Sequence, residues 1–458
     1  MKNIFLFMLV CLASLANLGC KKYLDKKSST GITVPTTLPD MQALLDNATN
    51  MNRQRTPTFG EASADDYFLL PADYETQTER DQNVYKWIPY ENYGWPNDWS
   101  SCYVPVYNSN YCLEQIQKIQ PTLQNQQAWN NVKGSALFYR AYYFLQLAWT
   151  FAKAYDTDSA FIDPGIALRQ TSDINVKSVR ANISETYERI IEDAEESIAY
   201  LPDLPVHVNR PSKAAAYGLL ARTYLSMRVY DSAFKYADLC LNIQHELMDY
   251  NGDPDIIGSF NDAESPFKLF NKETIFYTEM GYDITPISPF YAKVDTILLA
   301  LYADDDLRKK AFFAPYSGYL QFKGSYTQDM WTPFTGLATD EVYLIRAECY
   351  ARKNDKTNAL RDLNALLIKR YKSISFKPIT ATDNKEALKV ILSERRKELL
   401  YRGLRFQDIK RLNKEGAGII QKRLIAGQSF ILYPNDPRYA LPIPKEVIDN
   451  SGMSQNTY

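Results

Sequence analysis

One cluster of charged residues has the types and spacing that acid–base chemistry needs. Two of its carboxylates, Glu394 and Glu398, could serve as the acid and base of glycoside hydrolysis. Alternating charges at helical intervals are also typical of ion pairs that tie helices together, and this interpretation is favoured. A glycoside hydrolase stays open as the alternative. The cluster consists of Glu394, Arg395, Glu398, Arg405, Asp408 and Arg411.

The sequence offers no other motif that points to catalysis. It has only two histidines, His207 between Pro205 and Pro211 and His245 at a predicted helix end, so no histidine cluster is available for a metal site or a catalytic triad. A glycine-rich phosphate loop and a Gly-x-Ser-x-Gly elbow are both absent from the sequence. We therefore expect a protein that is not an enzyme and that holds no cofactor or metal ion.

Aromatic residues in loops are the second feature that could do chemistry. The chain has 34 Tyr, 21 Phe and 6 Trp, and aromatic faces are surfaces on which sugar rings stack. Aromatic residues in loops are better binding candidates than those with a helical period, and packing between loops and scaffold is an equal alternative for each ring. Arg80, Asn97 and Asp98 are predicted to hydrogen-bond ligand hydroxyls. The predicted stacking residues are Tyr85, Trp87, Tyr90, Tyr93, Trp95, Tyr316, Tyr319 and Trp331.

A further group, which begins with two aromatic residues, has a helical period and is predicted to lie in the core. Its members recur at intervals of four and three residues, which places them on one face of a helix. Pro105 lies inside this stretch and would kink the helix or mark its first turn. The group consists of Trp99, Tyr103, Val106, Asn110 and Leu113.

Helical hairpins are the elements that must position these residues. Ala221, Tyr224 and Ala233 have the same spacing as a later set, Ala347, Tyr350 and Ala359, which resembles tetratricopeptide-type repeats. Because more than a hundred residues separate the two sets, we expect the repeats not to form one contiguous array. Hairpins are predicted near 129–152, 211–243, 339–370 and 383–412.

Two long segments lack helical stripes and are rich in turn-forming residues. They lie near 60–98 and 249–338, and insertions between helical repeats commonly form a binding face. The predicted fold is mostly α, with a tetratricopeptide-type hairpin scaffold and a long irregular, loop-rich insertion. Residues 40–458 are predicted to form a single domain.

The N-terminus carries export signals. An apolar run over 4–16 predicts a signal peptide over 1–19, and it is shorter than the ~20 apolar residues of a membrane span. Leu18-Gly19-Cys20 resembles a bacterial lipobox, so Cys20 is predicted to be acylated, with simple cleavage as the alternative.

Other features of the chain constrain its environment. Residues 20–39 are polar and suit a tether between a lipid anchor and the fold. A net charge of −2 and a pI near 5.9 give no electrostatic case for nucleic acid. Cys102 and Cys112 could form a disulfide in an oxidising compartment, but buried thiols are favoured.

Motifs distributed along the chain resemble the RagB/SusD family, the lipid-anchored outer-membrane proteins of Bacteroidetes that bind nutrients for a partner transporter. The similarity begins at Cys20-Lys21-Lys22-Tyr23-Leu24-Asp25 and includes Arg346-Ala347-Glu348-Cys349-Tyr350-Ala351-Arg352. Its most specific part is Glu394-Arg395-Arg396-Lys397-Glu398-Leu399 with Gly403, Arg405, Asp408, Lys410 and Arg411. It ends with Leu441-Pro442-Ile443-Pro444-Lys445-Glu446-Val447-Ile448 and Gln455-Asn456-Thr457-Tyr458.

This resemblance implies both an architecture and a function. Four tetratricopeptide-type units would form the scaffold, and irregular segments on another face would hold the ligand. The implied protein is a lipid-anchored glycan binder of the outer membrane, displayed at the cell surface, that delivers ligand to a TonB-dependent, SusC-like transporter. A peptide ligand is the alternative within the same family. Arg402 stands where the family usually carries an acidic residue.

Overall fold

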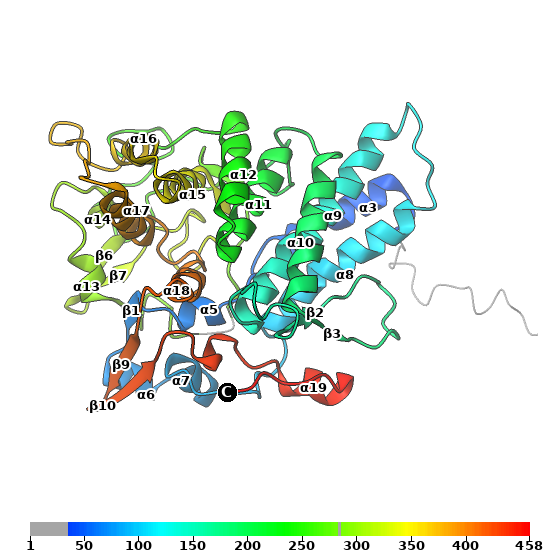
Figure 1. The fold of residues 1–458 in the computed structure, drawn as a ribbon, viewed down its shortest axis with the longest axis horizontal. Helices are drawn as coiled ribbons and strands as arrows, with labels where there is room; N and C mark the ends of the chain where they lie inside the picture. The colour runs from blue at the N-terminus through cyan, green and yellow to red at the C-terminus, as the bar shows by residue number, and fades with distance from the viewer. Residues whose placement is uncertain (1–34, 283–284) are drawn as a thin grey trace, which may run out of the picture.

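A computed structural model describes residues 35–282 and 285–458 of the protein. The predicted signal peptide, the lipidation residue Cys20 and most of the tether lie outside these residues. The described part is mostly helical, with short strands and long loops, so the predicted fold class is confirmed (Figure 1).

Long helices pack against one another in chain order and form the scaffold. The chain leaves this array after α12 and returns to it at α15, and these two helices pack directly against each other. The array is therefore continuous, and the prediction that the repeats are not contiguous is wrong. Its helices are α8 (Asp98–Ile116), α9 (Gln126–Phe151), α10 (Ile183–Ile198), α11 (Lys213–Met227), α12 (Tyr230–Ile243), α15 (Thr339–Arg352), α16 (Lys356–Leu367) and α17 (Asn384–Glu398).

The repeated Ala and Tyr positions explain how α11, α12 and α15 pack. Ala221 and Ala347 are fully buried, which lets neighbouring helices approach closely. Phe234 of α12 meets Tyr350 of α15 edge to face, with ring centroids 4.8 Å apart. The spacing that predicted two related hairpins thus reports real packing positions.

The start of α8 is fixed by a capping box. The side chain of Asn97 accepts a hydrogen bond from the Ser100 N–H (3.0 Å), and the Ser100 hydroxyl oxygen accepts one from the Asn97 N–H (2.9 Å). Pro105 lies within the helix, which continues to Ile116. Within this helix Cys102 and Cys112 are buried as thiols.

In the described residues, no helix combines the length and apolarity that a membrane span requires. The remaining helices are shorter than those of the scaffold or lie outside it. They are α3 (Leu38–Leu45), α4 (Ala48–Met51), α5 (Phe59–Ala62), α6 (Pro71–Glu75), α7 (Glu79–Tyr85), α13 (Thr296–Leu299), α14 (Arg308–Ala311), α18 (Arg405–Asn413), the 3₁₀ turn η1 (Pro437–Tyr439) and α19 (Lys445–Ser451).

The strands pair as antiparallel two-stranded ladders: β1 (Tyr67–Phe68) with β5 (Lys293–Val294), β2 (Pro164–Ala167) with β3 (Arg180–Asn182), β4 (Thr274–Phe276) with β8 (Leu337–Ala338), β6 (Phe313–Tyr316) with β7 (Tyr319–Phe322), and β9 (Gln421–Ile425) with β10 (Gln428–Leu432).

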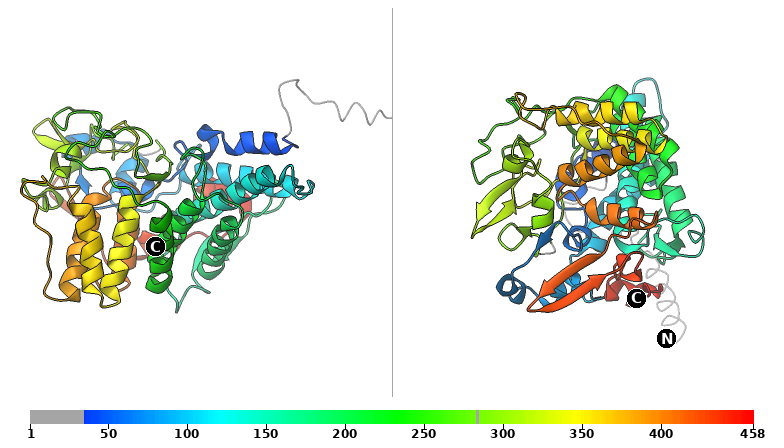
Figure 2. Two further views of the ribbon diagram at one scale, coloured as in Figure 1. Left: turned by 90° about the horizontal axis from the view of Figure 1, so that it is seen from above. Right: turned by 60° about the vertical axis from the view of Figure 1, so that its left-hand side comes forward.

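The two irregular segments come together in space. Seen from above in Figure 2, α15–α17 lie on one side of the molecule and the insertion between α12 and α15 lies on the other. Strand β1 of the first segment pairs with β5 of the second. The hydroxyl of Thr285 also lies within hydrogen-bond distance of two acceptors, the side-chain oxygens of Gln77 (2.6 Å) and Asp81 (2.8 Å). The scaffold therefore presents both segments as one irregular face.

Candidate ligand-binding site

The charged cluster near the C-terminal end is an internal ion network. Arg308 of the insertion places Nη2 2.6 Å from Glu394 and Nη1 2.9 Å from Glu398. Arg370 places Nε 2.7 Å from the other oxygen of Glu398. The side chain of Glu398 is fully buried, and a catalytic carboxyl must come within hydrogen-bond reach of the substrate. This geometry favours the structural interpretation of the cluster.

Three other residues of the cluster, Arg395, Asp408 and Arg411, connect α15, α17 and α18. Asp408 of α18 accepts hydrogen bonds from Arg395 of α17 (2.8 Å) and Arg411 (2.7 Å). Arg411 also pairs with Glu348 of α15, with N–O distances of 2.7 and 2.8 Å. The opposite charges thus form ion pairs between helices, as the favoured interpretation predicts.

Tyr85 and Trp87, predicted to stack on a ligand, are buried in the structure. The indole N–H of Trp87 donates to the Ser63 carbonyl (3.0 Å), and the Tyr85 hydroxyl oxygen accepts from the Leu69 N–H (2.8 Å). The guanidinium of Arg423, from β9, covers both rings at 4.1 Å from Tyr85 and 5.3 Å from Trp87. The structure therefore uses these two rings for packing between loop and hairpin.

The other aromatic residues of this loop divide by exposure. Tyr93 is buried against Phe59, with centroids 4.5 Å apart, and Tyr90 is half-buried beside Tyr93. Trp95 is 71% exposed just before α8. Of the five predicted rings in this segment, Trp95 is the most exposed.

The polar residues predicted to bind hydroxyls are engaged inside the protein. Asn97 caps α8, and Asp98 accepts hydrogen bonds from the N–H groups of Thr58 (2.7 Å) and Phe59 (2.8 Å). Arg80 donates to Asp81 at 2.9 Å. These three side chains hold the loops in place and are not part of the proposed site.

The second predicted aromatic group does gather on the surface. Tyr316, Tyr319 and Trp331 are 36%, 40% and 43% exposed. Phe290, also exposed, lies between two of them, with its ring centroid 4.5 Å from that of Trp331 and 6.0 Å from that of Tyr316. The sequence prediction did not include Phe290, although it has the same loop setting as the predicted rings.

The row of rings extends across two short sheets. Tyr316 and Tyr319 are cross-strand partners at the β6–β7 turn. Phe68 of β1 then meets Tyr319 edge to face, with centroids 5.8 Å apart and planes at 77°. Phe68 too was missed, since its place depends on the pairing of distant strands. We call this row the aromatic track; it consists of Trp331, Phe290, Tyr316, Tyr319 and Phe68.

The loop that carries Trp331 is held in place by a neighbouring carboxylate. Asp329 accepts one hydrogen bond from the Trp331 N–H (2.9 Å) and another from the Thr332 hydroxyl (2.8 Å). A cavity of about 170 Å³ opens beside Trp331, with Phe322 and Tyr401 among its lining residues. The track therefore combines flat rings with an adjoining hollow.

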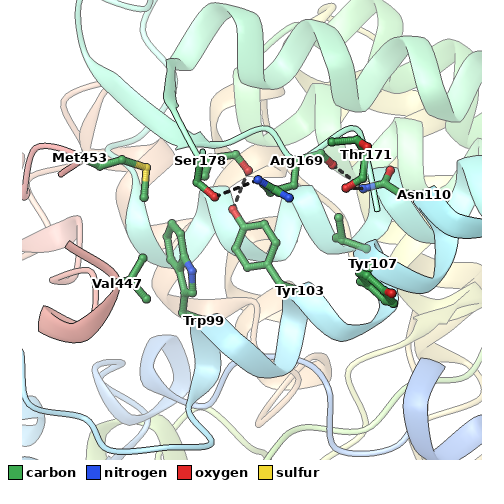
Figure 3. A pocket seen from close by; sticks show the side chains of 11 residues that line it. Trp99, Tyr103, Tyr107, Asn110, Arg169, Thr171, Ser178, Val447 and Met453 are labelled. Atoms are coloured by element: carbon green, nitrogen blue, oxygen red, sulfur yellow. Dashed lines mark hydrogen bonds between the residues drawn. The ribbon is translucent and has the colours of Figure 1, made fainter. Parts of the chain in front are cut away.

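A second cavity, of about 210 Å³, lies beside α8 and is shown in Figure 3. It is lined by four members of the helix face predicted to be core, Trp99, Tyr103, Val106 and Asn110. The Tyr103 hydroxyl donates to the Ala167 carbonyl (2.7 Å), and Asn110 donates to the Arg169 carbonyl (2.8 Å). Because these polar groups already bind the adjoining loop, the cavity offers few partners for ligand hydroxyls.

Exposed aromatic rings on a helical scaffold suit a ligand with apolar faces. Residues 22–225 match a family model described as "Starch-binding associating with outer membrane", and residues 271–458 match the model of the SusD family. The chain belongs to the RagB/SusD family, as its motifs predicted. Proteins of this family bind sugars and are associated with the outer membrane.

Solved structures share the fold. A SusD superfamily protein from Bacteroides thetaiotaomicron is 21% identical, with a TM-score of 0.74 over 92% of this chain and 100% of its own. A SusD-like carbohydrate binding protein from Bacteroides vulgatus is 20% identical, with a TM-score of 0.65 over 91% and 96%. A laminarin binding SusD-like protein is 17% identical, with a TM-score of 0.62 over 91% and 97%. No curated protein matches the chain.

Proposed function

We propose that this protein is a cell-surface lipoprotein that binds a glycan on the aromatic track and delivers it to a TonB-dependent, SusC-like outer-membrane transporter. The observation that carries the proposal is the exposed contact between Trp331, Phe290 and Tyr316 on the irregular face. Membership of a sugar-binding family supports a glycan as the ligand. The fold shared with a laminarin-binding protein adds to that support.

The track suits sugar rings for a simple physical reason. The C–H faces of a sugar pack on aromatic rings, while its hydroxyls need polar partners at the edge. Ser317, next to Tyr316, and Gln328, three residues before Trp331, are both exposed and offer such partners. Trp95 is proposed as a separate ring contact.

Delivery to a transporter follows from the proposed anchor. An acyl chain on Cys20 would hold the protein at the membrane surface. A binder held in this way cannot move a polar ligand across a bilayer by itself, so uptake requires a partner that can. In this family the partner is a SusC-like transporter, which this protein would cover as a lid over the bound ligand.

A glycan panel tests the proposal. We expect the mature protein to be retarded in affinity gels that contain one or more polysaccharides, with starch and laminarin in the panel. The Trp331→Ala variant should lose this retardation, and product analysis after long incubation should show no cleavage. Retention of peptides with no retention by any glycan would contradict glycan binding and favour the peptide alternative.

A further inference from the structure

A cleft of about 660 Å³ opens at the Phe68 end of the aromatic track. Its walls come from the β1 region at 65–71, the start of α13 at 295–297 and the β9–β10 hairpin at 420–427, with Arg396 of α17 and the buried rings of Tyr85 and Trp87 also in the lining. Sites for small ligands in proteins usually measure about 300–1,000 Å³. We call this space the hairpin cleft, and its size is sufficient for sugar units.

One part of the hairpin cleft is polar. Asp65 and Arg396 both line it, with side chains 22% and 16% exposed. Asp65 is fixed by Arg405, whose Nε lies 2.6 Å from it, and Arg396 is fixed by Asp66 at 2.8 Å. Both groups are thus positioned by neighbours and still reach solvent.

Asp65 stays ionised at neutral pH. Burial raises the pKa of its carboxyl, but the guanidinium groups of Arg405 and Arg396 outweigh burial, and the pKa falls to about 2. An ionised carboxylate accepts hydrogen bonds from hydroxyls, and a guanidinium donates them. Side by side, the two groups match the donors and acceptors of adjacent sugar hydroxyls.

The hairpin cleft also has three large apolar side chains that are open to solvent. Ile297, Leu424 and Ile420 line it and are 71%, 65% and 54% exposed. Clustered exposure of large apolar side chains often marks a ligand-binding groove. Apolar walls together with a carboxylate and a guanidinium match the amphipathic surface of a sugar, whose C–H faces are apolar and whose rim is polar.

Phe68 connects the hairpin cleft with the track. It lines the cleft, and it also contacts Tyr319 with centroids 5.8 Å apart. We propose that the hairpin cleft is a second subsite, which binds further sugar units of the same glycan chain that lies on the aromatic track. This inference rests on the proposed function and deepens it: the ligand is an oligosaccharide that is too long for the track alone.

Calorimetry with oligosaccharides of graded length tests the second subsite. The probes are malto-oligosaccharides and laminari-oligosaccharides from disaccharide to octasaccharide. In the wild type, affinity should keep rising with length after the track is filled. Ile297→Trp and Leu424→Trp each add a large side chain in the hairpin cleft. They should lower the affinity for the longest probes by about tenfold and leave the affinity for the shortest probes unchanged.

The control is Ile374→Trp, because Ile374 is 96% exposed outside the residues that line the hairpin cleft. Thermal unfolding should show that all three variants remain folded. Equal affinity of the wild type and both cleft variants for the longest probe would overturn the second subsite. In that case, weaker binding by Trp331→Ala would still support glycan binding on the aromatic track. Failure of every probe to bind the wild type would overturn both proposals for glucans.

Discussion

The rings of Phe290 and Trp331 lie 4.5 Å apart between centroids, in a tilted contact at 47°. They come from separate loops of the insertion between α12 and α15. Phe290 also contacts Tyr316, so one phenylalanine supports two neighbouring rings of the aromatic track. A surface whose rings are ordered before binding loses less conformational entropy when a ligand arrives.

Replacing Phe290 tests this support. Phe290→Ala should weaken glycan binding by a few-fold, less than loss of Trp331 itself, because Trp331 would keep its face but lose its neighbour. Titration calorimetry with the polysaccharide retained in the panel measures the change. An unchanged affinity would show that the contact between the two rings does not order the site.

The buried ion network predicts a large stability effect at one arginine. Arg308 is fully buried and pairs with Asp306, Glu394 and Glu398. Arg308→Met removes the cation that these three carboxylates share and leaves them only Arg370 and Lys397 as partners. We expect a loss of about 3–5 kcal/mol in the free energy of unfolding, measured with urea. Lys309→Met, at a partly exposed neighbour, should cost far less. Equal effects would mean that the network does not hold the insertion to α17.

Much of the scaffold was predictable because helices report their packing locally. The Ala and Tyr spacing in α11 and α15 marked real contacts, such as the one between Phe234 and Tyr350. The continuity of the array was not predictable, because separation in sequence sets no limit on distance in space. A long insertion can leave and rejoin a helical stack at the same point.

The site was predictable only in part, for a related reason. Tyr316, Tyr319 and Trp331 were identified as loop aromatics and are exposed, whereas Tyr85 and Trp87 have the same local signature and are buried. Their burial depends on Arg423, which comes from a distant hairpin. Exposure of a loop ring is thus decided by tertiary neighbours that a local pattern does not contain.

One buried carboxyl predicts how stability changes with pH. Burial, and then the negative charge of Asp66, raises the pKa of Glu61 from 4.5 to about 8. Between these values the folded protein binds more protons than the unfolded chain, so stability falls as pH rises. Relative to Glu61→Gln, the wild type should lose up to about 1.4 kcal/mol per pH unit between pH 5 and pH 7 in urea unfolding. Parallel pH profiles would contradict the raised pKa.

The lipid anchor and the transporter are tested together in cells. Cys20→Ala should release the protein from the membrane fraction, since the acyl chain is proposed to be its attachment. The wild type should co-purify from outer membranes with a TonB-dependent barrel in mild detergent. Recovery of the wild type alone, with the barrel present in the same extract, would contradict docking and leave glycan binding intact.

Calorimetry on single ring variants tests glycan binding on the track most directly. Trp331→Ala and Tyr316→Ala should each weaken binding of the retained polysaccharide by about tenfold, which corresponds to about 1.4 kcal/mol. The matched control is Tyr107→Ala, because Tyr107 is 45% exposed on α8, away from the track, and its affinity should equal that of the wild type. Wild-type affinity in all three folded variants would contradict the account.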